Sequence, residues 1–184
     1  MKTFLLKHIH HYYLYYIYTF IFFIVGFFTA LLMKAFHLPI YVFPFFELDQ
    51  IITLNTILTF MYKMILIIII MNLVSLHQFG LFFISLLVFL YGLHNGFYFI
   101  VLCNQFQNLF QFISDLFLIF CLNGGILILT SGLLEVSLNL FVVSFLFKEV
   151  IKPTELLTQL LNYSFIASLI LFIVIILKIY LLKL

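Results

Sequence analysis

The chain has 184 residues, of which 67% are hydrophobic, 21% are aromatic and only 8% are charged. Because soluble domains are about half apolar and about one quarter charged, this composition excludes a water-soluble globular protein and indicates an integral membrane protein. The formal net charge of +2 is spread along the chain without a basic run, so nucleic-acid binding has no support.

The first apolar stretch long enough to cross a bilayer covers residues 12–36, since a spanning helix needs about 20 apolar residues. It follows a short polar segment, residues 1–11, that contains two lysines and three histidines. This arrangement resembles a signal peptide, but the apolar stretch exceeds the roughly 7–15 residues of a signal sequence, and no small-x-small cleavage motif follows it. We therefore predict a first transmembrane helix here.

Further apolar stretches follow a predicted loop that contains Pro39, Pro44, Glu47 and Asp49. They cover residues 51–75, 79–103, 112–122, 126–147 and 154–184. The stretch at 112–122 is short and ends at Asn123-Gly124-Gly125, which is typical of a helix stop and a tight turn. The sequence therefore predicts an all-α, polytopic membrane helix bundle of about six transmembrane helices, or five if the short stretch merges with its neighbour.

Three ionisable side chains, Glu135, Lys63 and Asp115, stand out as candidates for membrane depth within these apolar stretches. A charge at membrane depth costs at least ~2.5 kcal/mol on insertion scales, so each is a candidate functional residue. Ser131 and Asn139 lie one helical turn before and after Glu135, on the same face. Since a carboxyl with hydroxyl and amide neighbours can exchange protons, we predict a proton pathway containing Glu135, Lys63, Asp115 and Asn139. The alternative is a neutral glutamate that only holds two helices together.

Lys63 and Asp115 each have a second interpretation. Lys63 lies in the middle of the predicted second span, where it can pair with a buried carboxylate, but a shifted span would bring its ammonium group to the interface. Asp115 follows a polar turn near the start of a predicted helix, where a carboxylate interacts favourably with the helix dipole without any chemical role.

The histidines allow a haem ligand as a competing interpretation, because a neutral imidazole can ligate haem within a helix bundle. His77 and His94 stand about 25 Å apart along a helix, so they cannot serve one iron from a single helix. No phosphate-binding loop, paired-histidine motif or nucleophile elbow is present in the sequence. We therefore predict no catalytic, cofactor-binding or metal-binding residue.

The choice of apolar residues is unusual: the chain has 27 Phe and 11 Tyr but no Trp. Arginine is also absent, and alanine occurs only at positions 30, 35 and 167. Residues with AT-rich codons have replaced those with GC-rich codons even where a bilayer accepts either type. This drift is typical of membrane subunits encoded in AT-rich organelle genomes and favours a multi-pass protein of the mitochondrial inner membrane.

Residues 116–142, which read LFLIFCLNGGILILTSGLLEVSLNLFV, resemble the core of NADH dehydrogenase subunit 4L. That family is a three-helix subunit of complex I with a proton-pathway glutamate in its second helix, and the resemblance places Glu135 there. The family's third helix carries another glutamate, near whose place this chain has Ser164. The resemblance implies a three-helix segment at residues 106–184, preceded by a three-helix membrane extension at residues 1–105.

The resemblance implies a membrane-arm subunit of the proton-translocating NADH:quinone oxidoreductase of mitochondria. Such a subunit is itself non-catalytic, binds no cofactor, and has the other subunits and lipids as partners. Two alternatives stay open. One is a structural subunit of cytochrome c oxidase, another respiratory complex or ATP synthase, and the other is a haem or quinone membrane anchor that uses His94.

Overall fold

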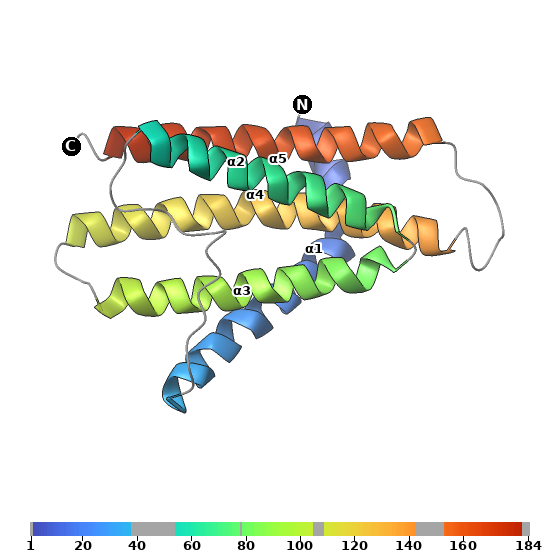
Figure 1. Ribbon diagram of the computed structural model, residues 1–184. Coiled ribbons are helices and arrows are strands. Elements are labelled where there is room, and N and C mark those ends of the chain that lie inside the picture. Colours follow the sequence, from blue (N-terminus) through green and yellow to red (C-terminus); the bar gives the residue numbers. More distant parts are fainter. Residues whose placement is uncertain (1, 38–53, 78, 105–108, 143–152, 182–184) are drawn as a thin grey trace.

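The structure of the chain is a computed structural model that describes residues 2–37, 54–77, 79–104, 109–142 and 153–181. These residues form five α-helices and no strand. The helices are α1 (Lys2–Ala35), α2 (Leu54–Ser75), α3 (Gly80–Asn104), α4 (Leu109–Val142) and α5 (Pro153–Leu181). Helices α2 to α5 lie along one common direction, and α1 crosses them obliquely (Figure 1). The predicted all-α helix bundle is confirmed.

Four of the helices contain segments long and apolar enough to cross a membrane. These segments are Tyr13–Ala35, Gly80–Asn104, Phe112–Val142 and Leu156–Leu177, and α2 adds a shorter apolar segment, Met61–Ser75. Large apolar side chains such as Phe28, Phe82, Phe120 and Phe172 are exposed on the outside of the bundle. A surface of this kind is stable only in lipid, so the chain is a membrane protein.

Helix α4 runs without interruption through Asn123, Gly124 and Gly125. The predicted helix stop is therefore wrong, and the described residues form five helices, as in the alternative in which the short stretch merges with its neighbour. Glycine ends a helix most readily by adopting a positive φ angle, and no described glycine does so. Each glycine costs about 1 kcal/mol of helix propensity relative to alanine. In a bilayer that cost is smaller than that of leaving backbone N–H and C=O groups without hydrogen bonds.

The first span ends close to its predicted boundary. His37 has a φ angle of 56°, and its backbone N–H donates to the carbonyl of Lys34 at 3.1 Å. The backbone N–H of Phe36 donates to the carbonyl of Leu32 at 3.0 Å. A left-handed residue with such bonds satisfies the last carbonyls of a helix. The predicted loop at Pro39, Pro44, Glu47 and Asp49 lies outside the described residues.

Small residues bring α1 and α3 into direct backbone contact. A Cβ atom at Gly26 would overlap the carbonyl oxygen of Phe89, and one at Gly92 would overlap that of Phe23. One turn further along α3, Gly96 packs against Ala30 in the same way. Gly92 and Gly96 thus form the G-x-x-x-G pattern that lets membrane helices approach closely. It sets the position at which α1 crosses α3 (Figure 1).

All five helices contribute to a single buried core. Its members include Phe23 of α1, Met64 of α2, Ile84 of α3, Leu129 of α4 and Leu171 of α5. The predicted segments 1–105 and 106–184 therefore pack against each other within one bundle. Within the second segment the described residues contain two helices, α4 and α5, where the resemblance implied three.

Candidate functional site

The most deeply buried carboxyl among the described residues belongs to Glu135 of α4, which is only 5% exposed. The hydroxyl of Tyr163, from α5, donates a hydrogen bond to Oε2 of Glu135 at 3.1 Å. Tyr163 is itself 5% exposed, so both partners of this hydrogen bond are shielded from solvent and lipid. A carboxyl and a phenol in direct contact form a pair through which a proton can move.

Gly132 makes the approach of Tyr163 to α4 possible. A Cβ atom at Gly132 would overlap the ring atoms Cγ and Cδ1 of Tyr163. Gly132 precedes Glu135 by three residues, so the two lie on the same face of α4. The tyrosine ring packs against bare backbone at Gly132, and its hydroxyl reaches the carboxyl one turn further along. This pairing was missed in the sequence, because nothing in α5 indicates which residue of α4 its tyrosine contacts.

The predicted polar neighbours of Glu135 on α4 are arranged differently from expectation. The hydroxyl of Ser131 is buried, and it donates to the carbonyl of Ile128 in its own helix at 2.9 Å. Asn139 is exposed, close to the end of α4 at Val142. Helical spacing does place Asn139 on the glutamate's side, but the side chain lies outside the buried region. Asn139 is therefore not part of the buried site.

A second interhelical hydrogen bond lies next to the first. Asn72 of α2 donates from Nδ2 to the hydroxyl oxygen of Ser164 at 2.8 Å and to the carbonyl of Ile68 at 2.7 Å. Ser164 follows Tyr163 directly in α5, so adjacent residues link α5 to α4 and to α2. The place at which the resemblance implies a second glutamate therefore holds a serine that is hydrogen-bonded to an amide.

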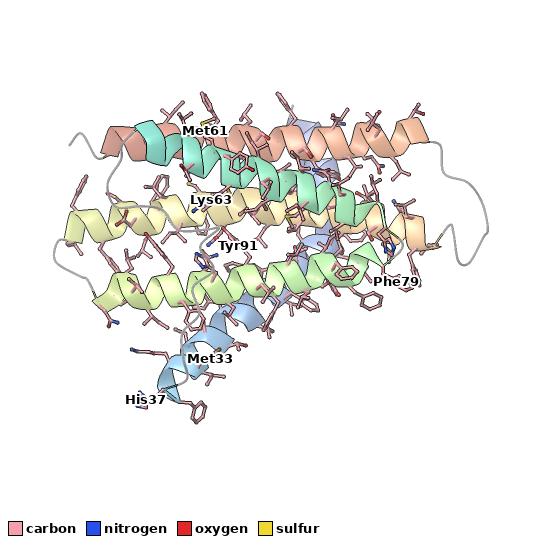
Figure 2. All side chains as sticks on the ribbon, viewed as in Figure 1. Met33, His37, Met61, Lys63, Phe79 and Tyr91 are labelled. Carbon is pink, nitrogen blue, oxygen red and sulfur yellow. The ribbon has the colours of Figure 1, made fainter. Side chains whose placement is uncertain are left out.

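Asp115 and Lys63 do not join Glu135 in one cluster. Asp115 is half-buried and lies 20 residues before Glu135 in the same continuous helix, which corresponds to about 30 Å. Lys63 is half-buried on α2, and in Figure 2 it lies at nearly the same level along the bundle as Tyr91 of α3. The predicted pathway residues are thus distributed along the whole length of the bundle.

Another buried polar group lies between α3 and α4, near the middle of both helices. The hydroxyl of Tyr91 donates to Oδ1 of Asn123 at 2.7 Å, and Asn95 donates from Nδ2 to the backbone carbonyl of Tyr91 at 2.8 Å. His94 is also buried here, at 3% exposed. His77, by contrast, is exposed in the turn between α2 and α3, where its Nδ1 accepts from the backbone N–H of Phe79 at 3.2 Å.

Within the described residues, no three side chains of histidine, cysteine, aspartate or glutamate come together as a metal ion would need. The fold and its buried groups define a polytopic α-helical membrane protein that holds the hydrogen-bonded Glu135 in its interior. No family model, no curated protein and no solved structure matches the chain.

Proposed function

We propose that this chain is a proton-conducting membrane subunit of a mitochondrial respiratory complex, located in the inner membrane. The first candidate for that complex is the proton-translocating NADH:quinone oxidoreductase. The observation that carries the proposal is the buried carboxyl of Glu135, held by the Tyr163 hydroxyl at 3.1 Å. In this role the chain catalyses no reaction by itself and works together with the other subunits of the complex.

The chemistry of the pair supports a relay. A glutamate costs more to bury in a bilayer than a glutamine or serine, although those residues would hold two helices together equally well. What a carboxyl adds is the capacity to take up and release a proton. The hydroxyl of Tyr163 donates to Oε2, so it can pass its proton to the ionised carboxylate while its oxygen takes up another proton, and neither group is consumed.

The choice of complex depends on the sequence. Three features support it: the AT-rich choice of residues, the resemblance of residues 116–142 to subunit 4L, and the position of Glu135 within it. Two features differ from that family: α4 is continuous, and Ser164 stands near the place of the second glutamate. The proposal of proton conduction therefore rests on the site, and the assignment to NADH:quinone oxidoreductase rests on the resemblance.

A structural subunit is the second candidate, because several polar pairs in the chain link one helix to another. Tyr18 and Ser85 connect α1 to α3 at 3.1 Å, Tyr91 and Asn123 connect α3 to α4, and Asn72 and Ser164 connect α2 to α5. In a purely structural protein, Glu135 and Tyr163 would add a fourth connection of the same kind, between α4 and α5.

The variant Glu135→Gln separates the two candidates. Glutamine keeps the size of the side chain and still accepts the hydrogen bond from Tyr163, but it cannot ionise. If the pair is a relay, we expect the complex to assemble normally on a native gel while NADH-driven proton pumping into membrane vesicles falls at least tenfold. The matched control is Asn139→Gln, on the exposed part of the same helix, which should pump normally. Unchanged pumping by Glu135→Gln would overturn the relay and favour the structural candidate.

A further inference from the structure

Helix α3 carries a stripe of polar side chains along one face. Tyr91, His94, Asn95 and Tyr98 follow the spacing i, i+3, i+4 and i+7, so they lie on one side of the helix. Tyr91, His94 and Asn95 are buried, and Tyr98 is half-buried. Four polar groups on one face of a helix in an otherwise apolar protein are costly in lipid, and such residues usually face the bundle interior or a hydrated path.

The stripe faces the first half of α4. Tyr91 donates to Asn123 at 2.7 Å. Because α3 and α4 run antiparallel (Figure 1), Tyr98 of α3 and Asp115 of α4 both lie on the same side of this hydrogen bond, toward the end of the bundle at Asn104. The separations are about 10 Å from Tyr91 to Tyr98 and about 12 Å from Asn123 to Asp115. We call these six residues, Tyr91, His94, Asn95, Tyr98, Asn123 and Asp115, the polar ladder.

Helix α1 packs on α3 directly beside the polar stripe and covers that side of the polar ladder. Gly92 and Gly96 stand beside the ladder residues on α3 and pack directly on the backbone of α1. The ring of Phe23 lies 6.0 Å from that of Tyr91, centroid to centroid. The glycine contact thus has a second consequence besides fixing the crossing of the helices: it covers the inner part of the ladder with protein rather than lipid.

The polar ladder is open at one end and closed at the other. Cys103 and Asn104, at the end of α3 beyond Tyr98, are exposed, and Asp115 at the same end of the bundle is half-buried. Directly past Asn123, the next large buried side chains of α4 are apolar, Ile126 and Leu129, and the buried hydroxyls of Thr130 and Ser131 follow nearer Glu135. Glu135 lies about 18 Å beyond Asn123 along α4. The ladder therefore reaches from one end of the bundle to its middle and is separated from Glu135 by an apolar layer.

We infer that the polar ladder is a hydrated half-path that carries protons between the Asn104 and Leu109 end of the bundle and the middle of the membrane. Asp115 exchanges protons with the aqueous phase at the open end. His94 takes up a proton in the middle of the membrane and returns it by the same route. The hydrogen bond from Tyr91 to Asn123 closes the inner end, since an amide oxygen does not take up a proton. The identity of the carried ion rests on the proposed function, whereas access of water to the ladder does not.

Silver ions test that access, because Ag⁺ is small, moves through hydrated paths and binds thiolates tightly. The test uses the full chain in its native complex in membrane vesicles, with Cys103→Ser and Cys121→Ser as background. The variant Asn95→Cys places a thiol inside the ladder. Leu86→Cys, on the lipid-facing side of the same helix and 53% exposed, is the first control, and Leu129→Cys in the apolar layer is the second. Protection from later maleimide labelling in detergent reports the reaction with Ag⁺.

We expect Asn95→Cys to react with Ag⁺ at least tenfold faster than both control thiols. Equal rates for the three thiols would overturn the inference. Should Asn95→Cys fail to assemble, Tyr98→Cys, nearer the open end, gives the same comparison with the same criterion. The outcome is independent of pumping: fast labelling with normal pumping by Glu135→Gln would keep the hydrated path and refute the relay. Slow labelling of Asn95→Cys together with lost pumping by Glu135→Gln would refute the hydrated path and keep the relay.

Discussion

Gly92 and Gly132 each bring two helices together, and what fills the space differs between them. At Gly92 the backbone of Phe23 in α1 occupies the room that a side chain would need, whereas at Gly132 the ring of Tyr163 occupies it. The first contact joins two helix backbones and brings no functional side chain into place. The second packs an aromatic ring whose hydroxyl reaches Glu135. Similar residues thus support assembly in one region and a buried hydrogen bond in the other.

A third glycine provides the reference for both. A Cβ atom at Gly124, in the middle of α4, would meet no atom within 4 Å. Replacing it with alanine removes a poor helix former without creating a clash, so Gly124→Ala should leave stability unchanged or raise it by up to about 1 kcal/mol. The change in stability caused by Gly92→Ala or Gly132→Ala, minus the change caused by Gly124→Ala, then measures the packing contribution alone.

The largest effect is expected for Gly92→Ala. The new methyl group would meet the backbone of α1, which cannot move away as a flexible side chain can, so α1 and α3 must separate. Overpacking of this kind costs about 1–3 kcal/mol, and we expect the upper end of that range or more. The measurement is the yield and melting temperature of the assembled complex beside Gly124→Ala. Equal melting temperatures for the two variants would contradict the close helix crossing.

Among the three glycine variants, Gly132→Ala should cause the second-largest loss of stability and the largest loss of proton pumping. Its methyl group would displace the Tyr163 ring, a side chain that can rotate away, at a cost of about 1–2 kcal/mol. Displacement of the ring removes the hydroxyl from Glu135, so proton pumping should fall several-fold in the complex that still assembles. A variant that loses stability but pumps at the rate of Gly124→Ala would show that the position of Tyr163 does not matter for function.

Tyr163→Phe separates the ring from its hydroxyl. The ring still packs on Gly132, and loss of one interhelical hydrogen bond in a membrane costs only about 0.6 kcal/mol. A relay therefore predicts a small change in melting temperature together with a several-fold loss of pumping, measured in the same vesicles. If both quantities stay at the wild-type level, the hydrogen bond is only a structural connection between α4 and α5.

The smallest effect is expected for Ser164→Ala, which removes the acceptor of the Asn72 amide. The cost should be about 0.6 kcal/mol or less. Ser168→Ala is the matched control one turn further along α5, because the Ser168 hydroxyl donates only to the carbonyl of Ser164 in its own helix. The two melting temperatures should differ by a small but measurable amount. A lower melting temperature for Ser168→Ala would contradict the connection between α2 and α5.

Sequence reasoning located the C-terminal ends of two helices well, whereas α1 begins at Lys2, ten residues before the predicted span. The spans predicted at residues 12–36 and 79–103 end within one residue of α1 and α3. The helix stop predicted at Asn123-Gly124-Gly125 was wrong, because the turn preference of these residues holds in water and not in lipid. In lipid the backbone must bond internally, and the Asn123 side chain is occupied by a hydrogen bond from Tyr91.

The site was predictable only in part for a similar reason. A carboxyl in an apolar run identifies Glu135 without any structure, since its cost depends on depth alone. The partner Tyr163 comes from another helix, and the role of Gly132 depends on that partner. The i, i+3, i+4, i+7 stripe of α3 was readable from the sequence, but which helix it faces was not. Asn139 shows the opposite error. Helical spacing places it correctly on the face of Glu135, but it does not tell how far along α4 the neighbouring helices cover that face.

Infrared difference spectroscopy of the working complex tests the central claim most directly, namely that Glu135 exchanges a proton during turnover. The spectrum taken with NADH minus that taken without it should contain a carboxylic C=O band that shifts in D₂O. We predict that this band disappears in Glu135→Gln, shifts in Tyr163→Phe because the hydrogen bond is lost, and stays unchanged in Asn139→Gln. A difference spectrum identical in Glu135→Gln and the wild type would contradict the account.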